Sequence, residues 1–267
     1  MVLEQLLNLK SVEKKAINVF FLGVVYTFIG IICARIIFPE YTGLMSVAFT
    51  SILLIPSLSF VLQLEENVEI REKKFALGVL FQDHKDIFKL YLSLFLGIFF
   101  AYAVTALVWP GSAIQVYFSP QTITAGISGA AVGGLSFSGI LVNNLIVLVV
   151  CFVLSIIYGS GAVLFLTWNA SVWGIVVGFF AKHAATVSNK SLVVAFVLAI
   201  VPILPHLVTE AASYVSAAIV GGVVSKAVIR EQLFSKKFHH IITDAIILMV
   251  MAVLLIVVAA IVEVYAL

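Results

Sequence analysis

The chain has 267 residues, of which 63% are hydrophobic and only 10% are charged. Soluble domains carry about 25% charged residues, so this composition excludes an ordinary soluble protein and indicates an all-α, polytopic bundle in a bilayer. The formal net charge of +2 is too small to indicate nucleic-acid binding. The length fits one bundle of about six transmembrane helices joined by short loops.

The N-terminal region, residues 1–62, is interpreted as an amphipathic lead followed by a transmembrane hairpin. The lead, residues 1–15, combines leucines with lysines and is expected to lie on the membrane surface. The spans of the hairpin are predicted at about 17–38 and 44–62, because each is apolar over the roughly 20 residues that a helix needs to cross a bilayer.

Residues 63–89 form the longest polar segment of the chain. They mix acidic and basic residues with several phenylalanines and leucines, which predicts a solvent-facing helix or hairpin resting on the membrane surface. This charged segment is also a candidate docking surface for protein partners, as is the basic stretch 225–240.

The remaining residues, 90–267, are interpreted as the main transmembrane bundle. An uncharged, glycine-rich stretch at 110–138 is interpreted either as a re-entrant or cavity-lining segment or as a loop over the outer mouth of the bundle. Residues 191–224 are too long for one simple span, so we expect a broken element, re-entrant or steeply bent, that crosses once. The regular spans are predicted at about 90–109, 139–158, 162–181 and 241–262.

The basic residues predict the orientation of the bundle. With the N-terminus inside, only three of the fifteen Lys and Arg residues lie outside or at the outer edge, namely Arg35, Lys182 and Lys190. Positive charge is enriched in cytoplasmic loops, so this orientation is favoured. The expected location is the cell membrane, with a cytoplasmic N-terminus and an external C-terminus.

Glu210 is the centre of the candidate site, because it is the only acidic residue between Asp86 and Glu231. An ionisable side chain at membrane depth is costly and must face a partner or a cavity.

Two prolines determine the predicted surroundings of Glu210. Proline suits the first turn of a helix and disrupts its interior, so Pro202 and Pro205 predict one helix ending near Val201 and a second beginning at Pro205. His206 and Glu210 are then four residues apart on one face of the second helix. Ser213 continues this polar face.

Three interpretations of His206 and Glu210 stay open. The two residues could bind a metal ion together with a third ligand, or Glu210 could gate or relay a cation or proton. Alternatively, Glu210 caps broken backbone or hydrogen-bonds an asparagine and so holds the bundle together. The amides expected at membrane depth beside Glu210 are Asn143, Asn144 and Asn169.

No metal or other cofactor and no enzymatic activity are expected from the sequence. Zinc sites take three or four protein ligands, and the H-E-x-x-H pattern of zinc proteases is absent. The serines lack a nucleophile-elbow context, and the glycine runs lack the lysine of a phosphate-binding loop. Small residues instead predict close helix contacts, either within the bundle or in a homo-oligomer, at Gly174, Gly178, Gly221 and Gly222.

A family resemblance rests on three motifs. Asn143-Asn144 opens one span, Thr167-Trp-Asn169 lies in the next, and Leu204-Pro-His-Leu-Val-Thr-Glu210 precedes a run of small residues. Together these motifs resemble the stage II sporulation protein M family of membrane proteins, in its archaeal-type form. The L-P-H-x-x-x-E element is the most specific of the three.

The resemblance covers roughly residues 90–267, so the hairpin at 17–62 looks like an addition. The family usually has glycine after the histidine and after the span asparagine, where this chain has Leu207 and Ala170. The resemblance implies a non-enzymatic membrane protein that anchors or docks partners. The alternative, from the residues themselves, is a transporter or channel for an ion or small solute that uses His206 and Glu210.

Overall fold

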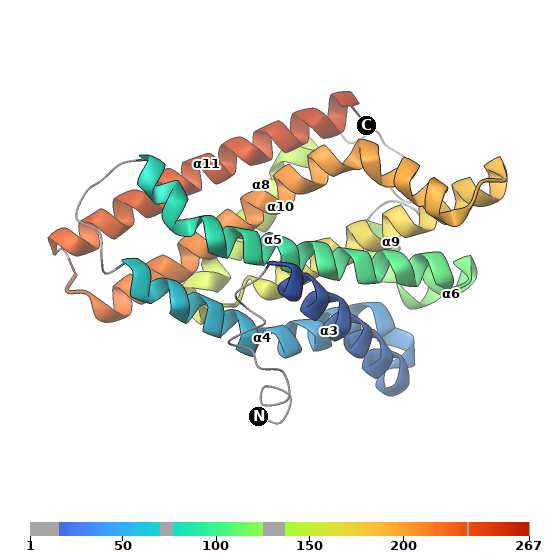
Figure 1. The fold of residues 1–267 in the computed structure, drawn as a ribbon, viewed down its shortest axis with the longest axis horizontal. Coiled ribbons are helices and arrows are strands. Elements are labelled where there is room, and N and C mark those ends of the chain that lie inside the picture. Colours follow the sequence, from blue (N-terminus) through green and yellow to red (C-terminus); the bar gives the residue numbers. More distant parts are fainter. Residues whose placement is uncertain (1–15, 70–76, 125–136, 234, 267) are drawn as a thin grey trace.

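The computed structural model describes residues 16–69, 77–124, 137–233 and 235–266, so the predicted lead at 1–15 lies outside the described residues. Every regular element in these ranges is a helix, and the long helices lie side by side in an elongated bundle (Figure 1). In chain order the elements are α3 (Ala16–Ile37), η1 (Pro39–Tyr41), α4 (Thr42–Glu69), α5 (Leu77–Val108), α6 (Gly111–Tyr117), α7 (Ser119–Thr124), α8 (Phe137–Tyr158), α9 (Val163–Ser188), α10 (Leu192–Arg230) and α11 (Lys236–Ala266).

Seven helices of the described residues are long and apolar enough to cross a membrane. This confirms the predicted helical membrane bundle. The sequence indicated about six spans and a broken element, and the seventh candidate span is that element, because α10 is helical and apolar from Leu192 to Ile229. Seven crossings would place the two ends of the chain on opposite sides of the bilayer.

Helix α10 corrects one prediction, because Pro202 and Pro205 lie inside a single helix rather than between two helices. Figure 1 shows that α10 bends instead of breaking. A proline removes one N–H donor and displaces the carbonyl four residues before it, which kinks a transmembrane helix without necessarily ending it. Ser191 caps the start of the helix, and its side chain accepts a hydrogen bond from the Val194 N–H.

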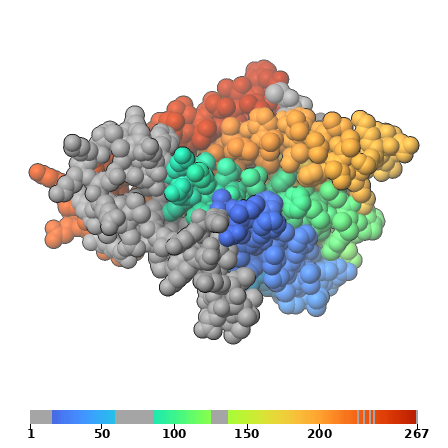
Figure 2. Space-filling model, in the orientation of Figure 1, coloured from blue at the N-terminus to red at the C-terminus, as the bar shows by residue number. Residues whose placement is uncertain are grey.

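The first half of α10 is largely uncovered by the rest of the bundle. Val193 is 73% exposed and Val201 is 59% exposed. Figure 2 shows this half of the helix (yellow-orange) extending beyond the end of α11 (red). Its apolar surface suits contact with lipid. A re-entrant course for this segment stays a prediction.

Glycines allow the closest helix contacts in the bundle. A methyl group on Gly174 would lie 2.5 Å from the Phe99 carbonyl oxygen, and Gly178 faces the same helix one turn later, so α9 approaches the backbone of α5. Gly221 brings α10 equally close to α8, and Gly222 is buried beside it. These contacts lie within one chain. A homo-oligomer stays a prediction.

The glycine-rich stretch 110–138 is described up to residue 124, where it forms α6 and α7. Gln121 on α7 is fully buried, and its Nε2 donates to the Gly43 carbonyl oxygen at 3.0 Å and to Ser171 Oγ at 3.4 Å. The segment therefore packs against the start of α4 and against α9. Residues 125–136 lie outside the described residues, so the re-entrant or covering course remains a prediction.

Two of the basic residues expected at the outer edge hold this segment to the bundle. Arg35, in the last turn of α3, donates to the Tyr117 hydroxyl at 2.9 Å, and its guanidinium carbon lies 4.2 Å from the centre of the Tyr117 ring. Lys182 on α9 donates to the Trp109 carbonyl oxygen at 2.6 Å. Arg35 therefore links α3 to the end of α6, and Lys182 links α9 to the connection between α5 and α6.

Candidate functional site

His206 and Glu210 lie on one face of α10, just after its two prolines. His206 is fully buried and Glu210 is 5% exposed. His206 Nε2 lies 3.0 Å from Glu210 Oε2, but the ring N–H direction is not aligned with this oxygen, so the contact is an ion-pair contact rather than a well-formed hydrogen bond. The four-residue spacing places the two groups one turn apart, as on any α-helix.

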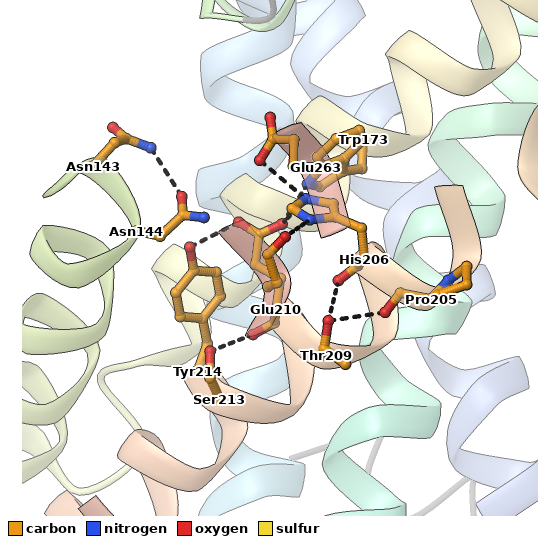
Figure 3. Close-up of polar contacts among 11 residues, drawn as sticks. Asn143, Asn144, Trp173, Pro205, His206, Thr209, Glu210, Ser213, Tyr214 and Glu263 are labelled. Atoms are coloured by element: carbon orange, nitrogen blue, oxygen red, sulfur yellow. Dashed lines mark hydrogen bonds and ion pairs between the residues drawn. The ribbon is translucent and has the colours of Figure 1, made fainter. Parts of the chain in front are cut away.

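Two neutral donors satisfy the Glu210 carboxylate. The Tyr214 hydroxyl donates to Oε1 at 2.7 Å, and the Trp173 indole N–H, from α9, donates to Oε2 at 3.0 Å (Figure 3). Hydrogen bonds to each oxygen are what a carboxylate needs in order to remain buried. Ser213, the residue that the sequence placed on this face, donates instead to the Glu210 backbone carbonyl oxygen at 2.6 Å.

Helix α11 supplies the remaining side of the site. His206 Nδ1 lies 3.0 Å from the Ala259 carbonyl oxygen, and Nε2 lies 3.6 Å from Glu263 Oε2. The Glu263 side chain is 22% exposed, so it is more accessible than the side chains of His206 and Glu210. The edge of the Trp173 ring packs on the imidazole, with ring centres 5.1 Å apart. We call His206, Glu210, Tyr214, Trp173 and Glu263 the His206 cluster.

Of the three asparagines predicted to neighbour Glu210, one points toward the His206 cluster and two do not. Asn144 on α8 is 4% exposed, and Figure 3 shows its amide directed toward Tyr214 and Glu210, although its Nδ2 has no hydrogen-bond partner. Asn143 is exposed and donates to Asn144 Oδ1 at 3.2 Å. Asn169 donates to a carbonyl oxygen of its own helix, that of Phe165, at 2.8 Å. Asn144 is thus the asparagine that points toward the cluster.

The cluster joins helices α9, α10 and α11 through hydrogen bonds and ion-pair contacts. Its chemical groups are two carboxylates, one imidazole, one phenol and one indole. Within the described ranges, no group of three or more His, Cys, Asp and Glu side chains is arranged to hold a metal ion. The hydrogen bonds and ion-pair contacts can cross-link the three helices. They also place acid–base groups from α10 and α11 in direct contact.

Comparison with known proteins gives one family. The family model for Stage II sporulation protein M matches residues 19–266. The match includes nearly all of α3 and all of α4, the hairpin that the resemblance of residues 90–267 left out. No curated protein and no solved structure matches the chain significantly. The chain belongs to the stage II sporulation protein M family.

Proposed function

We propose that the protein is a non-enzymatic membrane scaffold that docks partner proteins at one end of its bundle. The observation that carries this proposal is the length of α4 and α5. Both helices extend beyond the predicted spans, because α4 continues past residue 62 to Glu69 and α5 starts at Leu77, ahead of residue 90. At a rise of about 1.5 Å per residue, the two extensions add roughly 10 Å and 20 Å beyond the predicted spans.

The basic stretch 225–240 lies at the same end of the bundle as the extensions of α4 and α5. Figure 1 shows the end of α4, the start of α5 and the connection between α10 and α11 together at the left of the molecule. The end of α4 and the start of α5 carry both acidic and basic residues in the sequence, and the connection between α10 and α11 is basic. Mixed charge on a projecting helical pair suits a polar protein partner better than lipid tails. The positive-inside rule favours a cytoplasmic position for this charged end.

Site-specific photo-crosslinking in native membranes tests the scaffold. A photoreactive amino acid is placed at Glu66 or Asp83 on the charged end, and at Thr186 or Ser188 on α9 as matched controls at the other end. We expect discrete protein adducts of reproducible mass from the first two positions, identified by mass spectrometry, and none from the controls. Lipid adducts alone at all four positions would reject the proposal.

A second candidate function, transport of a cation or small solute, is favoured by one contact. Glu263 brings a partly exposed carboxylate to the buried His206, beside a bent helix, and transporters bind substrates at irregular helices of this kind. Proton and cation flux in proteoliposomes tests it with wild type, Glu210→Gln and the surface control Glu40→Gln. Flux lost only in Glu210→Gln, in protein that unfolds at the wild-type temperature, would support transport. No flux in any of the three would remove it.

A further inference from the structure

The Ala259 carbonyl oxygen fixes one hydrogen on the His206 ring. Nδ1 lies 3.0 Å from this oxygen, and a carbonyl oxygen can only accept a hydrogen bond. Nδ1 must therefore carry hydrogen. In a neutral imidazole the other nitrogen, Nε2, would then present a lone pair.

The surroundings of Nε2 do not suit a lone pair. Its polar neighbours across α10 and α11 are carboxylate oxygens, Glu210 Oε2 at 3.0 Å and Glu263 Oε2 at 3.6 Å. Glu210 already accepts hydrogen bonds at both of its oxygens, which is the pattern of an ionised carboxylate. A lone pair facing two acceptors is repulsive, whereas a hydrogen placed between them is attractive.

We infer that His206, Glu210 and Glu263 form a binding site for one exchangeable proton, which is shared between Nε2 and the Glu263 carboxyl group. In the transfer, the O–H bond of the Glu263 carboxyl breaks and an N–H bond forms at Nε2, which leaves a Glu263 carboxylate and an imidazolium. Glu210 takes no part in the transfer, so the net charge of the three groups is the same before and after it. The inference goes beyond the scaffold proposal and does not depend on it, and it holds whether or not the proton crosses the membrane.

Glu263 is the group through which the proton enters. Its side chain is 22% exposed, against 0% for His206 and 7% for Glu210, and it lies in the last turn of α11, whose end reaches the bend of α10 (Figure 1). The other ionisable groups around the site are Tyr214 on α10 and the buried Cys151 thiol on α8, which interacts electrostatically with Tyr214. Helix α9 contributes the Trp173 indole, a neutral donor.

Two spectroscopic probes on the full chain in lipid nanodiscs test the site. Infrared difference spectra recorded against pH report protonated carboxyl groups, and ¹⁵N-histidine spectra, assigned with His206→Gln, report hydrogen on each ring nitrogen. We expect Nδ1 to carry hydrogen throughout, and a single second proton to leave as pH rises. Glu263→Gln should remove the carboxyl part of this signal and move the release by about one pH unit or more.

Matched variants keep the test decisive. Glu40→Gln, at an exposed acid in η1, should leave both spectra unchanged. Glu263→Asp keeps a carboxyl group, so it should retain a proton release at a changed pH even if Glu263→Gln folds poorly. A wild-type His206 with hydrogen on Nε2 alone, or a carboxyl signal unchanged in both Glu263 variants, would overturn the inference.

Discussion

The indole N–H of Trp173 on α9 lies 3.0 Å from Oε2 of Glu210 on α10, and it is the hydrogen bond by which α9 joins the His206 cluster. Trp173 also packs edge-on against the His206 ring. One side chain thus supplies a donor to the buried acid and an apolar wall to its imidazole partner. Because α9 also packs closely on α5, this contact connects the cluster to the centre of the bundle.

Trp173→Phe should destabilise the protein by about 1–3 kcal/mol, because it keeps an aromatic ring but leaves Oε2 of a buried carboxylate without this donor. The measurement is reversible unfolding in mixed micelles. Trp168→Phe, on the same helix but outside the cluster, is the matched control and should cost less. Equal losses in the two variants would mean that ring volume, and not the indole N–H, carries the effect.

Gly174→Ala should cost about 1–3 kcal/mol through overpacking. The new methyl group would lie 2.5 Å from the Phe99 carbonyl oxygen and 2.7 Å from Tyr102 Cβ, and backbone atoms of a packed helix cannot easily move aside. Gly111→Ala is the control, because a methyl group there meets only the Phe179 ring at 3.7 Å. Thermal unfolding of both variants checks the difference. A tolerated Gly174→Ala would show that α5 and α9 can separate without loss.

The sequence predicts the bundle well because a transmembrane helix is a local property of about 20 apolar residues. The exception is the element at 191–224, where Pro202 and Pro205 predict a helix end that the structure does not have. In water a proline inside a helix is strongly unfavourable, but in a membrane the alternative is unpaired backbone in hydrocarbon, which costs more. The helix therefore continues through Pro202 and Pro205 and bends.

The candidate site is predictable only where it is local. His206 and Glu210 are predictable from their spacing, and the same four-residue step leads from Glu210 to Tyr214, which binds the carboxylate where Ser213 does not. Trp173 and Glu263 come from other helices, so no spacing along the chain connects them with Glu210. The sequence signal for Glu263 is that it is an acidic residue directly after the uninterrupted apolar run 245–262.

Asn144→Leu tests whether the buried amide on α8 is structural. Its Nδ2 is buried without a hydrogen-bond partner, and an unpaired buried donor costs about 1–3 kcal/mol. Leucine has the same branched arrangement of four side-chain heavy atoms and removes this cost, so stability should stay unchanged or rise by up to about 1 kcal/mol. Unfolding measurements decide the outcome. A clear loss of stability would mean that the amide pairs with the cluster, directly or through water.

Replacing both Pro202 and Pro205 with alanine should straighten α10. Alanine restores the two missing N–H donors and removes the rings that displace the preceding carbonyls. Spin labels at Val193 and Ile229, which are 73% and 79% exposed, report the end-to-end distance by pulsed electron paramagnetic resonance. A straight helix would separate these positions by about 54 Å, and the bent wild-type helix should give a shorter distance that lengthens in the double variant. Labels at Leu164 and Val187 on α9 are the control, and their separation should not change. An unchanged α10 distance would mean that packing against α9 and α11, rather than the prolines, holds the bend beside His206.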